Sequence, residues 1–183
     1  MMKKLLVVSA AIAATATPAA AQTLTYELEA EVAVKCGVYK FDGPSVPVNF
    51  ADLSTTPSDT FITESAGSAT YRCNAPGGFT RTISSANGGV MIRTGSSGGA
   101  GNSIPFEMSH GGGSGLGTGG FVPLTSNVIS NLGGSTAFLN GQTGGVNFRV
   151  AGVAAAPGGN EAPGTTVFAG DYTDVVTISV VAN

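Results

Sequence analysis

Residues 24–34 alternate between apolar and polar side chains, and this period of two leaves few structures open to the segment. The apolar set consists of Leu24, Tyr26, Leu28, Ala30, Val32 and Val34. Only Ala33 interrupts the alternation. A helix, with 3.6 residues per turn, would spread these side chains around its circumference, whereas a strand places them all on one face. The pattern therefore predicts an extended strand with one buried face, directly before Cys36.

The residues ahead of this strand have the order of a secretory signal. Lys3 and Lys4 precede an apolar stretch at 5–14, and three alanines at 19–21 follow it. We expect a signal peptide over 1–21, with cleavage before Gln22. The apolar stretch is too short for a permanent membrane helix, which needs about 20 residues, so we expect export without direct membrane insertion.

The remainder of the chain has the composition of an all-β domain. Short runs of Val, Ile, Thr, Phe and Tyr are separated by Gly, Pro, Asn and Ser, and the chain contains 28 glycines. Such runs indicate many short strands joined by turns. Disorder is disfavoured because 42% of the residues are hydrophobic. We therefore expect one β-sandwich domain over 36–183.

Several strands can be placed from local alternation. Ala69, Tyr71 and Cys73 should share the buried face of one strand. Residues 79–83 and 90–93 suggest a hairpin across the glycines at 88–89. Further strands are expected at the following positions: 104–108 and 146–150. Prolines at 44 and 47 make 46–50 an edge strand or an extended connector.

The last expected strand covers residues 172–181. One of its faces carries Tyr172, Val176, Ile178 and Val180. Val175 and Val181 place apolar groups on the other face too, which favours a position within the sandwich rather than at its rim. The residues Gly170-Asp171-Tyr172 are compatible with a tyrosine corner, in which the hydroxyl binds back to the backbone, and equally with an ordinary core tyrosine.

Cys36 and Cys73 form an isolated pair, and in an exported protein such a pair predicts a disulfide. A metal site is disfavoured, because two cysteines and one distant histidine lack the spacing of zinc ligands. No cofactor motif remains, so we expect neither metal nor cofactor. Two of the eight basic residues lie in the signal segment, which leaves no basic patch for nucleic acid.

Four features resemble catalytic motifs or residues but lack the context that catalysis needs. The pattern G-x-S-x-G at 95–99 is followed by no helix, and the pattern G-x-G-x-x-G at 115–120 lies in a glycine-rich stretch. His110 is the sole histidine and is expected to be a solvated loop residue. Glu27, Glu29 and Glu31 are interpreted as one solvated strand face. We therefore expect no catalytic residues and a structural protein rather than an enzyme.

Taken together, these features resemble a known family. The relevant parts are the N-terminal strand with Cys36, the strand end Ala69-Thr-Tyr-Arg-Cys73, the stretch Val146-Asn-Phe-Arg-Val-Ala-Gly152 and the terminal Gly170-Asp-Tyr-Thr-Asp174 with its alternating Val and Thr. The chain resembles the spore coat protein U domain family, which includes the subunits of archaic chaperone–usher pili. The glycine-rich region 95–120 departs from the family pattern.

The resemblance implies an incomplete, immunoglobulin-like Greek-key sandwich completed by donor-strand exchange. The donor strand would be 22–35, with Leu24, Tyr26, Leu28, Ala30 and Val32 entering the groove of a neighbouring subunit. The acceptor groove would lie along the last strand, at Tyr172, Val176, Ile178 and Val180. The implied partners are other pilus subunits, a periplasmic chaperone and an outer-membrane usher. Export through the periplasm would end in a surface pilus that serves adhesion and biofilm formation.

Two other functions fit the same sequence. A secreted coat protein could use the domain as a monomer, with its N-terminal strand paired inside its own sandwich. A carbohydrate-binding sandwich or tip adhesin is also compatible, although the absence of Trp removes the usual aromatic platform for sugars. Polymerisation distinguishes the pilus subunit from both.

Overall fold

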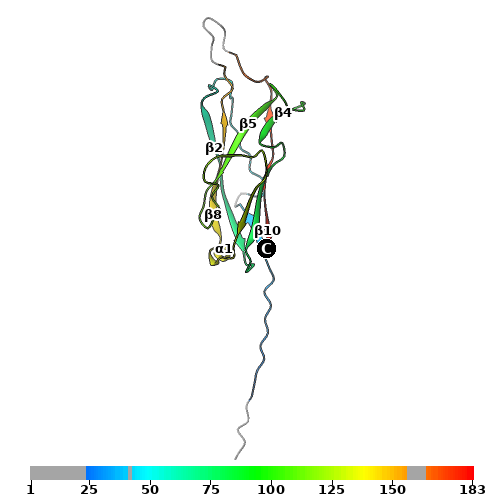
Figure 1. Cartoon of the computed structure of the whole chain (residues 1–183), viewed down its shortest axis with the longest axis vertical. Coiled ribbons are helices and arrows are strands. Elements are labelled where there is room, and N and C mark those ends of the chain that lie inside the picture. The colour runs from blue at the N-terminus through cyan, green and yellow to red at the C-terminus, as the bar shows by residue number, and fades with distance from the viewer. Residues whose placement is uncertain (1–23, 41–42, 156–163) are drawn as a thin grey trace, which may run out of the picture. The chain divides into compact units, whose positions relative to one another are not determined.

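The computed structural model describes residues 24–40, 43–155 and 164–183. The expected signal peptide, the first two residues of the expected donor strand and the middle of the loop at 154–166 lie outside these ranges. Residues 33–183 form one compact unit, and residues 24–32 belong to a separate one. The larger unit is built from two antiparallel sheets, which confirms the all-β prediction (Figure 1).

The larger sheet has seven strands, ordered β1-β2-β8-β5-β4-β9, with β6 paired to β5. Its strands are β1 (Cys36–Tyr39), β2 (Phe61–Cys73), β4 (Val90–Arg93), β5 (Ser103–His110), β6 (Val122–Pro123), β8 (Gln142–Ala151) and β9 (Tyr172–Thr173). The long central strands β2, β8 and β5 carry most of the pairing, and β1 covers only the last four residues of β2.

The smaller sheet has three strands in the order β10-β3-β7. They are β10 (Val176–Ala182), β3 (Phe79–Ser85) and β7 (Val128–Leu132). The one helix among the residues described above, α1 (Thr136–Asn140), begins after Ser135, whose hydroxyl accepts a hydrogen bond from the N–H of Ala137. This cap allows the chain to turn from β7 into β8 within ten residues.

The main core lies between the two sheets. Tyr71 of β2 stacks on Phe79 of β3, with ring centroids 6.1 Å apart, and Phe79 meets the edge of Phe138 from α1 at 4.9 Å. All three side chains are buried. Leu53, Ile104, Val150 and Val153 form a second, smaller cluster. Because aromatic side chains bury large apolar areas, this stack contributes much of the inter-sheet packing.

The register of β2 changes within the strand. The pairing with β8 shifts between Ser65 and Gly67, and Gly67 has a φ of +80° that favours glycine. Before the shift Ile62 packs inward, Ala66 packs inward at the shift itself, and after it the inward residues are Ala69, Tyr71 and Cys73. The face predicted for 69–73 is therefore confirmed, but the alternation cannot be extended backwards through Gly67.

The hairpin expected between 79–83 and 90–93 is wrong. β3 pairs with β10 and β7, whereas β4 pairs with β5 and β9, so the two strands lie in different sheets. The glycines at 88–89 lie in the crossover between the sheets. Gly89 donates its N–H to the Ser85 hydroxyl at 2.6 Å, which holds this crossover tightly at the end of β3.

The single last strand expected over 172–181 is also divided. Residues 172–173 pair with β4 in the larger sheet, and 176–182 pair with β3 in the smaller one. Asp174 lies at the switch: its carboxylate accepts from the N–H of Asn87 at 3.0 Å and from that of Val175 at 2.8 Å, and it also accepts from the Ser85 hydroxyl. One carboxylate therefore secures both crossovers between the sheets.

The Tyr172 hydroxyl lies 2.7 Å from the carbonyl of Phe168 and 3.0 Å from that of Gly101. A hydroxyl has one proton, so it donates to one carbonyl at a time. The bond to a carbonyl four residues upstream is the backbone tie that a tyrosine corner predicts. The Tyr172 ring packs against the smaller cluster rather than the main core.

Candidate partner-binding groove

An apolar groove of about 670 Å³ runs along the side of the sandwich between β1 and β10. One wall is formed by β1 and by residues 43–50, and the other by 172–178. The floor is formed by side chains from the larger sheet: Ala66, Ala69, Met91, Phe106, Val146 and Phe148. The groove therefore opens onto the main core rather than onto polar surface.

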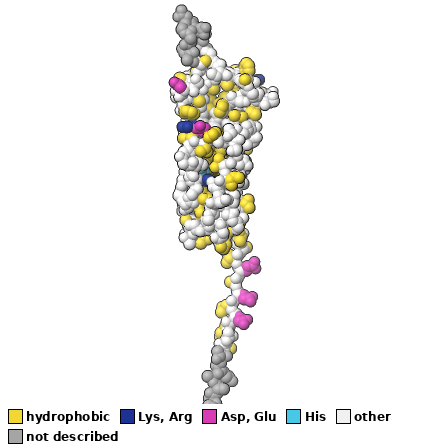
Figure 2. Space-filling view, viewed as in Figure 1, with side chains coloured by type: hydrophobic (Ala, Val, Ile, Leu, Met, Phe, Trp, Pro, Cys, Tyr) yellow, Lys and Arg dark blue, Asp and Glu magenta, His cyan; other side chains and the backbone are white. Residues whose placement is uncertain are grey.

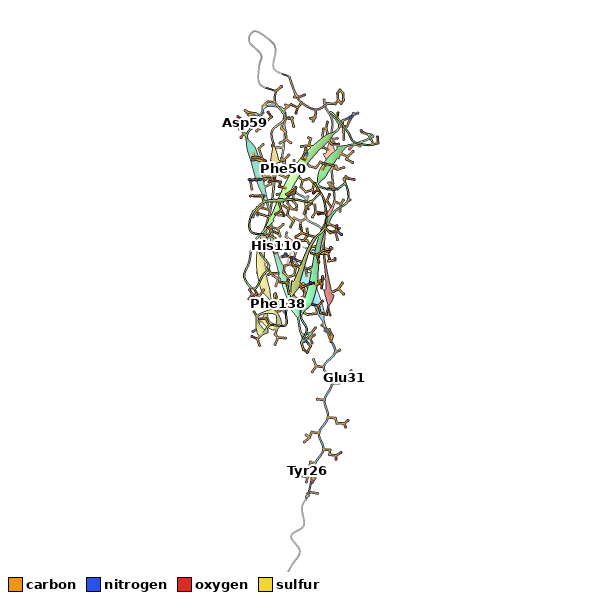
Figure 3. The ribbon with its side chains drawn as sticks, in the orientation of Figure 1. Tyr26, Glu31, Phe50, Asp59, His110 and Phe138 are labelled. Carbon is orange, nitrogen blue, oxygen red and sulfur yellow. A yellow bond between two sulfur atoms is a disulfide. The ribbon has the colours of Figure 1, made fainter. Side chains whose placement is uncertain are left out.

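Residues 46–50 were expected as either an edge strand or a connector, and the structure shows a connector without strand pairing. Val46, Val48 and Phe50 of this connector line the groove, and Figure 3 labels Phe50. Sequence reasoning did not assign them to the site, although their alternation with Pro47 and Asn49 marks one apolar side of an extended segment.

β10 forms the other wall and is an edge strand. Among the described residues it pairs only with β3. This corrects the expectation, drawn from its two apolar faces, that the last strand lies inside the sandwich. The second apolar face is also uncovered: Val181 in β10 and Val175 just before it are both 66% exposed. The apolar groups on that face are therefore not covered by the domain itself.

The free edge of β10 presents its backbone to the groove. The Val175 carbonyl accepts from Ala86 N–H, and Asn183 N–H donates to the Gly78 carbonyl, so the odd-numbered residues bond towards β3 and its flanks. In an antiparallel pair, alternate residues direct N–H and C=O to opposite sides. Val176, Ile178 and Val180 therefore direct their backbone polar groups away from β3, towards the unpaired edge.

The same residues contribute apolar side chains. Val176, Ile178 and Val180 are half-buried and pack against the main core. Of the four groove residues expected from sequence, Tyr172, Val176 and Ile178 line the groove, and Val180 packs on the core without lining it. A strand placed beside β10 would meet backbone hydrogen-bonding groups and an apolar floor together.

The predicted disulfide between Cys36 and Cys73 is confirmed. The two residues are directly opposite in the β1–β2 ladder, with Cα atoms 4.0 Å apart. The bond therefore fixes the start of β1, the short strand whose Val38 and Tyr39 belong to the groove wall. With only four residues paired to β2, β1 depends on this link for its position.

Most of the expected donor segment belongs to a compact unit separate from the domain. Residues 24–32 form neither helix nor strand pairing, and Leu24, Tyr26, Leu28 and Val32 are between 74% and 91% exposed. Figure 2 shows the acidic side chains of this segment along one side of an extended chain. Large apolar side chains in such a state lack the burial that would stabilise them.

His110 is not the solvated loop residue expected from sequence. It ends β5 and is buried beside Tyr71, in the middle of the domain in Figure 3. Nδ1 lies 2.6 Å from the Gly111 carbonyl, so it carries the proton, and Nε2 accepts from the Tyr71 hydroxyl at 2.8 Å. Burial lowers the pKa of His110 and raises that of Tyr71.

Arg81 completes this buried polar cluster. Its guanidinium donates to the Leu116 carbonyl at 2.7 Å and to the Ser130 hydroxyl at 3.0 Å, and it lies 5.9 Å from the centre of the Tyr71 ring. The cluster joins both sheets through the core. Its members, Tyr71, Arg81 and His110, are not among the residues that line the groove. It therefore stabilises the sandwich rather than forming part of the candidate site.

Within the described ranges, no group of three or more His, Cys, Asp or Glu side chains could hold a metal ion. In the same ranges no helix is long and apolar enough to cross a membrane. No family model matches the chain, and no curated protein matches its sequence significantly.

Proposed function

We propose that the chain is a structural subunit of a chaperone–usher surface pilus, which polymerises when residues 24–32 of one copy fill the groove of the next. The observation that carries this proposal is the unpaired edge of β10 beside an apolar groove of about 670 Å³. The groove needs an apolar strand, and the chain carries an alternating apolar segment whose large side chains are exposed.

Strand addition uses both properties of the groove. Backbone groups of the inserted segment would pair with those of Val176, Ile178 and Val180, while every second side chain would enter the groove. β10 has seven residues and the donor segment nine, so the inserted strand is long enough to cover the whole edge. Burial of the large donor side chains contributes on the order of 5–12 kcal/mol before losses from ordering.

The alternation also predicts which side chains of the donor segment would face solvent. With Leu24, Tyr26 and Leu28 directed inward, Glu27 and Glu29 would face solvent in the completed sandwich. Carboxylates on that face oppose further pairing or stacking of the joined strand. The same segment can therefore fill one groove without promoting indiscriminate aggregation.

Such a contact joins two different surfaces, a groove and a strand, and each copy carries one of each. Heterologous contacts of this kind propagate into open filaments. Before assembly, the exposed edge of β10 would be an aggregation hazard. The family resemblance adds the partners and the final role to this proposal. A periplasmic chaperone would fill the groove first, and at an outer-membrane usher a donor segment would replace the chaperone. The resulting pilus would serve surface adhesion and biofilm formation.

The test replaces Leu28 with Asp in the full exported chain. We expect polymers to disappear and monomers with an open groove to remain, because a carboxylate cannot be buried in the apolar groove. Size-exclusion chromatography and electron microscopy of negatively stained samples measure both species. The matched control is Glu29→Gln, one residue away on the solvent side, which should polymerise normally. Filaments formed by the Leu28→Asp chain would contradict the donor assignment.

A further inference from the structure

The residues just before Cys36 are held by hydrogen bonds to a single residue, Asn74. Asn74 Oδ1 accepts from the backbone N–H of Lys35 at 2.6 Å, and its Nδ2 donates to the carbonyl of Ala33 at 2.9 Å. Its own backbone N–H donates to the Lys35 carbonyl at 3.1 Å. These three bonds all go to the residues immediately before Cys36.

The side chain of Asn74 completes the end of the β1–β2 ladder, where the backbone N–H of Asn74 already bonds to the Lys35 carbonyl. Cys36 lies opposite Cys73, so Lys35 comes next, opposite Asn74. Beyond Asn74 the chain leaves the strand for the turn that is closed by Gly78 N–H and the Ala75 carbonyl. A carboxamide carries the same donor and acceptor as a peptide group. The amide of Asn74 therefore takes the place of the missing backbone and holds 33–35 in line with β1.

A subunit that carries both a groove and a donor segment has to keep that segment out of its own groove, and the hydrogen bonds of Asn74 bear on this requirement. β1 forms a wall of the chain's own groove. To enter that groove as a strand, residues 24–32 would have to fold back on β1 through a tight turn at 33–35. Ala33-Val34-Lys35 contains no Gly, Asn, Asp or Pro, the residues that form such turns. Cys36 is fixed by its disulfide, so the reversal cannot be moved into β1.

We propose that Asn74 is a positioning residue that disfavours insertion of the donor segment into its own groove and so reserves it for a second copy of the chain. The proposal rests on the proposed function, since it assumes that the groove accepts this segment. Specifically, the two side-chain hydrogen bonds of Asn74 determine whether the donor segment enters its own groove or the groove of another copy.

The experiment measures how well the groove accepts a donor from outside. A synthetic peptide of residues 22–34 is titrated into the full exported chain at a dilution where the chain is monomeric. In the Asn74→Ala variant, the chain's own segment competes for the groove. We expect the peptide to bind about tenfold more weakly, the change expected from loss of two ordinary hydrogen bonds. Asn74→Asp keeps the acceptor for Lys35 N–H and should weaken binding by only about threefold.

A second substitution separates competition from structural damage. When Leu28→Asp is combined with Asn74→Ala, the internal donor can no longer compete, and peptide affinity should return to that of the unsubstituted chain. Unchanged peptide affinity in Asn74→Ala would overturn the proposal. A loss of peptide affinity that persists when Leu28→Asp is added would overturn it as well. If the unsubstituted chain and the Leu28→Asp chain both fail to bind the peptide, the proposed function itself is wrong.

Discussion

The carboxylate of Asp174 accepts a hydrogen bond from the backbone N–H of Asn87, 3.0 Å away across the two places where the chain changes sheets. It also accepts from Ser85 and from the N–H of Val175. Asp174 lines the groove, and Val175, the next residue, leads directly into β10. The position of the unpaired edge of β10 therefore depends on a polar side chain, that of Asp174, which the apolar alternation of the sequence does not indicate.

Replacement of Asp174 with Ala should lower the free energy of unfolding by about 2–4 kcal/mol, because hydrogen bonds to a charged group are lost and two part-buried donors, the Asn87 N–H and the Ser85 hydroxyl, become unpaired. Urea unfolding in the Leu28→Asp background, which keeps the chain monomeric, provides the measurement. Asp171→Ala, three residues earlier and exposed, is the control and should change stability by less than about 0.5 kcal/mol. Equal effects of the two substitutions would show that the carboxylate does not hold the crossovers.

His110 makes the stability of the domain sensitive to acid. Burial lowers its pKa in the folded chain below that of the unfolded chain, which is about 6.5. The unfolded state then binds more protons as the pH falls through this range, so stability is complete above about pH 6.5 and declines below it, by at most about 1.4 kcal/mol per pH unit. Urea unfolding between pH 4.5 and 7.5 measures this dependence.

The comparison that isolates His110 is His110→Gln, which retains hydrogen-bonding groups but does not titrate. The difference in stability between this variant and the unsubstituted histidine should shrink as the pH falls from 7 to 5. A difference that stays constant with pH would show that another group causes the acid sensitivity.

The disulfide should act on the groove as well as on global stability. Replacement of Cys36 and Cys73 together with Ser should cost roughly 3–4 kcal/mol, from the entropy of closing a 37-residue separation. Because β1 has only four residues paired to β2, we also expect weaker binding of the 22–34 peptide. Urea unfolding with and without reductant measures stability, and peptide titration measures the groove. Unchanged peptide affinity in a folded double variant would show that β1 holds its place without the bond.

Mixtures of subunits should reveal the polarity of assembly. The Leu28→Asp chain keeps its groove but has a defective donor, so it can accept one neighbour and then ends the filament. Added to the unsubstituted chain at a tenth of the total, it should shorten filaments to about ten subunits, since each incorporated copy terminates one chain. Filament lengths in electron micrographs provide the count. Lengths that do not respond to the mole fraction would exclude strand exchange as the link.

Local alternation predicted the strands well where one face meets the core, as at Phe106 and Met108 in β5 and at Val146 and Val150 in β8. It failed at the crossovers, because nothing local distinguishes a turn within one sheet from a step between two sheets. The residues that define this step, Ser85 and Asp174, are far apart in sequence and meet only in the fold. The disulfide was predictable because Cys36 and Cys73 offered a single pairing.

His110 and Asn74 show a second limit. His110 is preceded by an alternating strand and followed by glycines, and the glycines made a loop position seem natural. Its burial depends on Tyr71, which comes from another strand. The role of Asn74 depends on its being opposite Lys35, a register that only the folded β1–β2 pair defines. Side chains that act across a sheet leave little trace in local pattern.

The link between Cys36 and Cys73 also determines how a fibre of such subunits would carry a pulling force. Tension that enters through the residues ahead of Cys36 passes through a covalent bond to Cys73 and so into β2, which spans the sheet and is paired to β8 over ten positions. The four-residue pairing of β1 is bypassed and is not peeled open. In the proposed fibre, mechanical failure would then occur at the non-covalent contact with the next groove rather than in the short pairing of β1 with β2.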